Sequence, residues 1–172
     1  MTRPRAAVLA GLFAAALGLA HAAEPPAQDG AAEFVAMAIR EHAGEVRLAR
    51  LAAERAATPE VRAFAETMLA DHRDAKAAFL EVGRALKLRP PRGIADEAEE
   101  EFAALSALEG RAFDREFLAY AVDVHESVLA DFVREARAGH GEASREAERE
   151  LAMLRRHLQT ARNLKVRLGA GP

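Results

Sequence analysis

The strongest constraint on the fold comes from four long segments that are free of internal proline and are separated by short stretches containing proline or glycine. Helices are therefore predicted for four ranges: 31–57, 59–87, 110–138 and 142–168. Thr58-Pro59-Glu60 is typical of a helix start, with threonine as the cap, proline in the first turn and an acid near the positive end of the helix dipole. Gly139-His140-Gly141 predicts a tight turn between the last two helices.

The second and third of these helices are separated by a longer connection. Pro90-Pro91-Arg92-Gly93 ends the second helical segment, and residues 94–109 are expected to form a crossing connection with a short helix. The predicted fold is all-α, with two antiparallel helical hairpins joined by this connection, which is an arrangement that ferritin-like four-helix bundles use. A composition with 51% hydrophobic residues, and without cysteine or tryptophan, agrees with a soluble helical domain.

The first 23 residues have the pattern of a secretory signal peptide. Arg3 and Arg5 precede an uncharged apolar run that reaches Ala20, and Ala20-His21-Ala22 offers small residues to a signal peptidase. The run is shorter than the ~20 residues that a helix needs to span a bilayer. We therefore expect residues 1–23 to be removed on export to the periplasm. The mature chain would then consist of a flexible leader at 24–30, the bundle domain at 31–168 and a tail at 169–172.

The net charge and the absence of cysteine argue against some classes of partner and of metal site. Without Arg3 and Arg5, 22 basic residues remain against 27 acidic ones, a formal charge of −5, which argues against nucleic acid as a partner. No integral membrane segment is expected after signal cleavage, whereas a protein partner or a homo-oligomer is left open. The absence of cysteine excludes disulfides and thiolate metal sites, so a metal would need histidine and carboxylate ligands.

Several polar residues interrupt the apolar faces of the predicted helices: Glu41 and Glu45 in the first, His72 in the second, His125 in the third and His157 at the margin of the fourth. An unpaired carboxylate at such a position would cost several kcal/mol unless it gained a partner or a proton. Counting residues from each turn places Glu45 and the three histidines at similar heights, because each helical residue rises by about 1.5 Å. We therefore expect these four side chains to meet in one layer near the middle of the bundle.

Three imidazoles and a carboxylate suit one transition-metal ion, such as zinc, iron, copper or manganese, better than calcium or magnesium. The predicted ligands are Glu45, His72, His125 and His157. Three further acids are expected to orient these ligands or to replace one of them: Glu41, Asp71 and Asp114. The other two histidines beyond the signal peptide, His42 and His140, are expected to be exposed to solvent.

A set of motifs also resembles a known family. The most specific are Asp71-His72 and Phe113-Asp114-Arg115; the others are Phe34-Val35, Glu45, Pro59 to Met68, Gly110 to Ala112, His125, Leu154 and His157-Leu158. In these residues, over about Glu33 to Leu164, the chain resembles bacterial domain of unknown function 4142, and it departs from the family pattern at Met153, where proline would stand. The resemblance implies a ferritin-like fold and an exported location, with no established reaction.

The spacing around the histidines argues against a two-iron centre. Di-iron members of the ferritin-like group use Glu-x-x-His motifs from two helices. Three apolar residues, Leu69, Val122 and Leu154, stand three positions before the predicted histidine ligands. Too few carboxylates are therefore present to bridge two metal ions, and a site for one metal, or for none, is favoured.

Two interpretations of function remain. In the first, the chain is an exported helical bundle that binds a metal in its central polar layer. In the second, it is a non-catalytic, structural or stress-related envelope protein whose buried polar network fixes helix register, binds no metal, and which acts through a protein partner. No enzymatic reaction is assigned, because none of the three serines beyond the signal peptide lies in a glycine-rich elbow.

Overall fold

The computed structural model describes the protein from Ala27 to Gly169, and over these residues it contains five helices and no strand. The helices are α1 (Ala27–Arg55), α2 (Pro59–Ala85), α3 (Asp96–Ser106), α4 (Gly110–Ala138) and α5 (Glu142–Gly169). The prediction of an all-α fold is confirmed for these residues. The predicted signal peptide at 1–23, the first part of the predicted leader and the end of the predicted tail lie outside the described residues.

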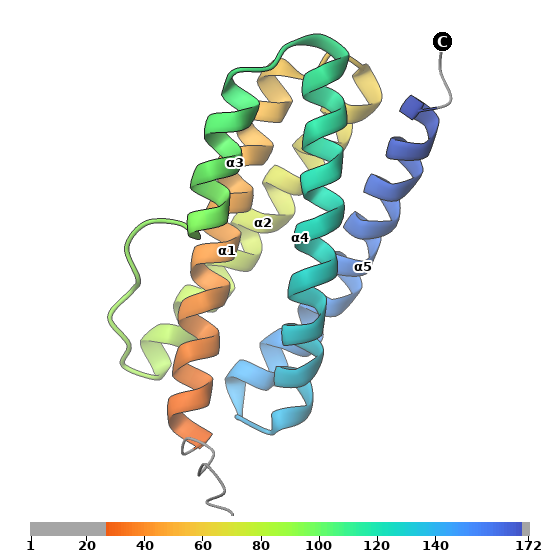
Figure 1. Ribbon diagram of the computed structural model, residues 1–172. Helices are drawn as coiled ribbons and strands as arrows, with labels where there is room; N and C mark the ends of the chain where they lie inside the picture. The colour runs from red at the N-terminus through yellow and green to blue at the C-terminus, as the bar shows by residue number, and fades with distance from the viewer. Residues whose placement is uncertain (1–26, 170–172) are drawn as a thin grey trace, which may run out of the picture.

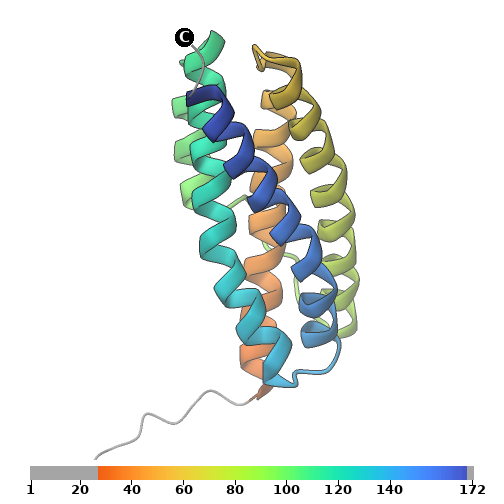
Figure 2. The same cartoon turned by 90° about the vertical axis from the view of Figure 1, so that its right-hand side faces the viewer.

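The four long helices run side by side as a helical bundle (Figure 1). The most extensive contacts join α1 to α2 and α4 to α5, and α2 and α5 connect these two antiparallel hairpins. Figures 1 and 2 place the start of α1 and the α4–α5 turn at one end of the bundle, and the α1–α2 turn at the other. None of the helices between residues 27 and 169 is both long enough and apolar enough to cross a bilayer.

Helix α1 begins at Ala27, four residues before the predicted start, so residues 27–30 of the predicted leader are helical. Proline is compatible with a helix start, and Pro25-Pro26 can therefore stand directly before α1 in the sequence. Gly30 also remains within the helix. A Cβ atom at this glycine would lie 3.3 Å from Cε1 of His140, so the residue permits a close approach between α1 and the α4–α5 turn.

The connection contains the short helix that was expected there, α3, which lies against α1. Gly44 of α1 allows this contact, because a Cβ atom there would lie only 2.6 Å from Cβ of Ala98. Arg47 then donates a hydrogen bond to Glu99 (2.7 Å), and its guanidinium lies 3.9 Å from the ring centre of Phe102. The side chain of Leu105 is fully buried and packs α3 against the core.

The buried apolar residues of the described chain form two clusters, one toward each end of the bundle. The cluster near the α1–α2 turn includes Leu48, Met68, Phe117 and Leu158. The cluster near the α4–α5 turn includes Phe34, Phe79, Phe132 and Leu154. The sequence positions between the two clusters carry five of the buried polar residues: His42, Glu45, His72, His125 and His157. The hydrophobic core is therefore divided by a polar layer at mid-height.

The turn between α1 and α2 is held by a carboxylate from α4. Asp114, which is fully buried, accepts hydrogen bonds from the backbone N–H groups of Ala57 (2.8 Å) and Thr58 (2.9 Å). Thr58 occupies the cap position of α2, but its hydroxyl makes no cap hydrogen bond, which corrects the prediction of a threonine cap. Asp114 thus joins one hairpin to the other through two charge-assisted hydrogen bonds.

Replacing Asp114 by alanine should lower the free energy of unfolding by about 3 kcal/mol, because two backbone N–H groups lose a charged acceptor inside the protein. Urea denaturation of the Asp114→Ala variant measures this loss. The matched control is Asp123→Ala, since Asp123 lies on the same helix with its side chain exposed, and there we expect a change below about 0.5 kcal/mol. If Asp114→Ala lost no more stability than Asp123→Ala, the hydrogen bonds of Asp114 at the α1–α2 turn would not stabilise the fold.

Candidate metal centre

Five polar side chains, at least one from each long helix, form the layer between the two apolar clusters: His42 and Glu45 on α1, His72 on α2, His125 on α4 and His157 on α5. We call this set the central layer. Each of its members is at most 3% exposed. The four side chains that were predicted to meet, Glu45 and the three histidines at 72, 125 and 157, do lie together. The structure adds His42, which corrects the prediction that this histidine is exposed.

Two of the imidazoles have a fixed tautomer, because each has an outer partner that can only accept a hydrogen bond. Nδ1 of His125 lies 2.8 Å from the carbonyl oxygen of Ala121, and Nε2 of His157 lies 2.9 Å from Oδ2 of Asp71. The hydrogens of the neutral rings must therefore lie on these outer nitrogens. The inner nitrogens, Nε2 of His125 and Nδ1 of His157, are left with lone pairs.

His72 lies between two other imidazoles and can adopt either tautomer. Its Nδ1 is 3.0 Å from Nδ1 of His42, and its Nε2 is 3.3 Å from Nδ1 of His157. In one arrangement, His72 donates from Nε2 to His157 and accepts a hydrogen from His42. In the other, His72 donates from Nδ1 to His42, and its Nε2 presents a third lone pair to the interior. The two arrangements differ in whether a proton lies between His72 and His157.

The inner nitrogens are close enough to share one ion. One ring nitrogen from each of His72, His125 and His157 lies within 4.8 Å of the other two. The ring centres form a nearly regular triangle with sides of 5.1, 5.4 and 5.5 Å. Donors around a tetrahedral ion with bonds of ~2.1 Å are ~3.4 Å apart. Small side-chain movements would therefore be enough to complete the coordination.

Glu45 supplies a carboxyl group beside the three imidazoles. Its Oε2 lies 3.9 Å from Nε2 of His72 and has no hydrogen-bond partner, whereas its Oε1 accepts a hydrogen bond from the hydroxyl of Tyr120 (2.8 Å). Burial raises the pKa of Glu45 to about 8, although the hydrogen bond from Tyr120 opposes this shift. Without a cation nearby, this carboxyl group is therefore mostly protonated at neutral pH.

The imidazoles are neutral for the same physical reason. Burial lowers the pKa of His42 and of His125 to about 3, and it lowers the pKa of His72 well below 6.5. Burial also lowers the pKa of His157, against the opposing effect of Asp71. Neutral imidazole is the form that binds metal ions.

The surroundings of the layer are apolar. The ring of His42 stacks on Phe79, with 5.5 Å between the ring centres, and the edge of His157 meets Phe64 from the other side. A cavity of about 10 Å³, which is room for roughly one water molecule, touches the layer at Glu45, His72 and His125. The space beside the imidazoles is therefore about the size of one water molecule.

The three acids that were expected to support the ligands differ in position. Asp71 contacts His157 directly. Glu41 lines the cavity, and burial together with the charge of Glu97 raises its pKa. Asp114 does not belong to the layer: it holds the α1–α2 turn, and its position eleven residues before His125 on α4 corresponds to ~16 Å along the helix.

Tyr120 was not predicted from the sequence. It is the only tyrosine of the chain, and burial raises its pKa, followed by the charge of Glu45. A buried tyrosine hydroxyl normally has a hydrogen-bond partner, and this rule was the available signal for a polar neighbour.

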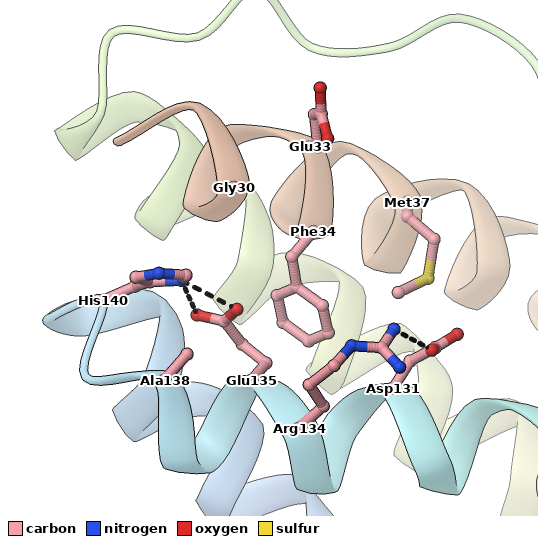
Figure 3. Close-up of a pocket in the computed structure, with 9 residues that line it drawn as sticks. All are labelled: Gly30, Glu33, Phe34, Met37, Asp131, Arg134, Glu135, Ala138 and His140. Carbon is pink, nitrogen blue, oxygen red and sulfur yellow. Dashed lines mark hydrogen bonds and ion pairs between the residues drawn. The ribbon is translucent and has the colours of Figure 1, made fainter. Parts of the chain in front are cut away.

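A larger cavity, about 640 Å³, lies away from the central layer, between the start of α1 and the end of α4 (Figure 3). At one side of it, Glu135 accepts from Nδ1 of His140 at 3.0 and 3.1 Å. Ser144 also donates to Glu135 and accepts from the backbone N–H of His140, so this cluster holds the α4–α5 turn. His140 is half-buried, which corrects the prediction that it is exposed.

Comparisons with known proteins agree with this fold. The sequence profile of a family described as a domain of unknown function, DUF4142, matches residues 16–164, which confirms the family resemblance. The crystal structure of a DUF305 fragment from Deinococcus radiodurans is similar, with a TM-score of 0.74 and 24% sequence identity, over 83% of this chain and 99% of that fragment. This likeness concerns the fold alone. No curated protein matches the chain.

The metal-free protein should lose stability as the pH falls below 6.5. There the unfolded chain protonates His42, His72 and His125, whereas the folded protein keeps them neutral, so acid favours unfolding. Glu45 acts in the opposite sense: its folded pKa of about 8 exceeds 4.5, so its contribution is complete at low pH and is lost as the pH rises through 8. The net loss between pH 7 and pH 5.5 should be about 2 kcal/mol.

Urea denaturation with a chelator present at both pH values measures this change. The Glu45→Gln variant lacks the opposing effect, so its loss over the same range should grow to about 4 kcal/mol. Equal stability of the wild type at both pH values would contradict the assignment of neutral, buried imidazoles.

Proposed function

We propose that this protein, which belongs to the DUF4142 family, holds one transition-metal ion in its central layer. The ligands are His72, His125 and His157, with Glu45 as the fourth. Zinc, copper, iron and manganese all accept imidazole and carboxylate ligands, and their order of affinity favours copper and zinc.

The observation that carries this proposal is the arrangement of hydrogens around the three imidazoles. The ring nitrogens that face away from the centre are engaged by Ala121, Asp71 and His42. Histidine ligands of metals usually donate their other N–H to a carbonyl, a carboxylate or another acceptor, which fixes the tautomer and the ring orientation. All three rings follow this pattern and bring one nitrogen each to a common centre. In the metal-bound form, the ion takes the place of the proton between His72 and His157.

Glu45 provides the fourth ligand of the proposed site and also a negative charge. An ion bound by three neutral imidazoles alone would leave a double positive charge in an apolar interior, and one carboxylate compensates half of it. The unpartnered Oε2 of Glu45 is the atom available for this contact, while Tyr120 holds the other oxygen. Only one carboxylate accompanies the three imidazoles in the layer, so the proposal is for a single ion.

We further propose that the bundle is of the ferritin-like four-helix type and acts in the periplasm. The four long helices and the connection bearing α3 are consistent with the first part. The basic start, apolar run and small residues within the first 23 positions support the second part. The mass of the mature protein recovered from the periplasm tests export, because cleavage after Ala22 or Ala23 gives a defined N-terminus.

Elemental analysis of the untagged mature protein tests the metal site. We expect about one transition-metal ion per chain, as for a site with one set of three or four ligands. The His72→Ala/His125→Ala double variant should contain none while remaining helical by circular dichroism. His140→Ala is the matched control and should keep its metal, because His140 lies at the α4–α5 turn.

A metal-free wild type that stays metal-free after incubation with zinc, copper, iron and manganese would sink the proposal. The central layer would then be a polar network that sets helix register, and the second interpretation, in which the protein acts through a protein partner, would replace the first.

Asp71 should tune the affinity of the site without being a ligand. Asp71→Asn removes the charged acceptor for His157, which should weaken metal binding by about 10- to 100-fold while the number of sites stays the same. Competition with a chromophoric chelator measures the affinity. Asp74→Asn is the control, since Asp74 is exposed on the same helix. Unchanged affinity in Asp71→Asn would exclude a role for this carboxylate in orienting His157.

A further inference from the structure

The cavity beside the central layer indicates the side from which the layer is reached. Of its nine lining residues, seven belong to α1 and α4, among them Glu41, Val124 and Val128, and none belongs to the outer surface between α2 and α5. Glu41, Val124 and Val128 are half-buried, whereas Glu45, His72 and His125 are fully buried. The cavity therefore leads from the buried ligands toward the seam between α1 and α4.

Carboxylates follow this seam. Glu41, Glu45 and Glu101 are close enough to Tyr120 for their negative charges to add to the effect of burial on its pKa. They come from two helices, α1 and α3, that lie beside α4 (Figure 1). Oε1 of Glu101 and Oε2 of Glu45 are buried and have no hydrogen-bond partner. One unpartnered carboxylate oxygen on α3 and one beside the imidazoles are groups that a passing cation would contact.

Cations of the protein compensate this charge only in part. Glu41 interacts with Arg40, but also with Glu97 and Asp131, which have the same sign. Glu101 interacts with Glu116 and Asp123, again of the same sign. Arg47 and Arg134 are engaged by Glu99 and Asp131. The seam therefore retains negative charge, which raises the local concentration of cations.

On the opposite side of the layer, between α2 and α5, Asp71 accepts the N–H of His157. The ring of His157 is buried behind this carboxylate, and it does not line the cavity beside the central layer. A second acidic groove lies there, lined by Asp74, Glu146 and Glu150 among others. Its lining shares no residue with the cavity beside the central layer.

We propose that divalent cations reach the central layer through the seam between α1, α3 and α4, passing Glu101 and Glu41 before they meet Glu45. This inference rests on the proposed metal centre, to which it adds a route. Glu101 and Glu41 attract the ion, and Glu45 draws it inward and remains as a ligand. The groove between α2 and α5 takes no part in loading.

The rate of cobalt(II) uptake tests this route. Co²⁺ absorbs visible light when imidazole and carboxylate bind it, so stopped-flow absorbance follows loading of the metal-free mature protein at low salt. Glu41→Gln/Glu101→Gln removes two carboxylates from the seam, and Asp74→Asn/Glu146→Gln removes two from the opposite groove. The first variant should load about tenfold more slowly than the wild type, and the second at the wild-type rate. High salt should reduce the difference, because it screens charges.

Each other outcome contradicts the route. Equal slowing in the two variants would mean that only net charge matters, and an unchanged rate in the seam variant would mean that cations pass elsewhere. A seam variant whose final cobalt content falls well below that of the wild type would make Glu41 or Glu101 a ligand rather than part of a route. If the wild type takes up no cobalt, the metal centre itself fails, and this result is visible before any variant is compared.

Discussion

Five ionisable side chains share one buried layer, and the rest of the structure depends on their remaining uncharged there. Four imidazoles remain neutral and one carboxyl group gains a proton, because burial penalises every charged form. The bundle separates its apolar residues into two clusters around this layer instead of forming one continuous core. A polar layer of this kind fixes the relative height of the helices, since sliding one helix by a turn would place a histidine among phenylalanines.

Much of this helical arrangement was predictable from the spacing of apolar residues and from the positions of proline and glycine. Proline and glycine marked the turns, and counting from those turns placed Glu45, His72, His125 and His157 at one height, where they meet. These heights are predictable because a straight, regular helix rises by a constant amount per residue. His42 was missed although its spacing was suitable, four residues after Ala38 and three before Glu45. This spacing places His42 on the same face of α1 as Ala38 and Glu45, where the structure buries it.

The remaining errors concern contacts between elements that are far apart in the sequence. Tyr120 contacts Glu45 across 75 positions, and Asp114 reaches the α1–α2 turn across 56 or 57. Helical periodicity predicts which face of its helix a residue occupies. It does not predict which polar group on the neighbouring helix that residue will contact. Asp114 lies on the same side of α4 as His125, but at a different height. Because of this difference in height, Asp114 holds the α1–α2 turn and does not support a ligand.

Helix α3 differs from the other helices in what it contributes. It supplies Ala98 and Leu105 to the core and Glu101 to the seam, but no member of the central layer. The residues that would hold an ion and part of the charge that would attract one are thus encoded on separate elements. Substitutions on the outer face of α3 can change how fast ions arrive while leaving the geometry of the imidazoles intact. The exchange of ions with the surroundings would thus be adjustable from the exposed face of α3, while Ala98 and Leu105 hold its inner face against the core.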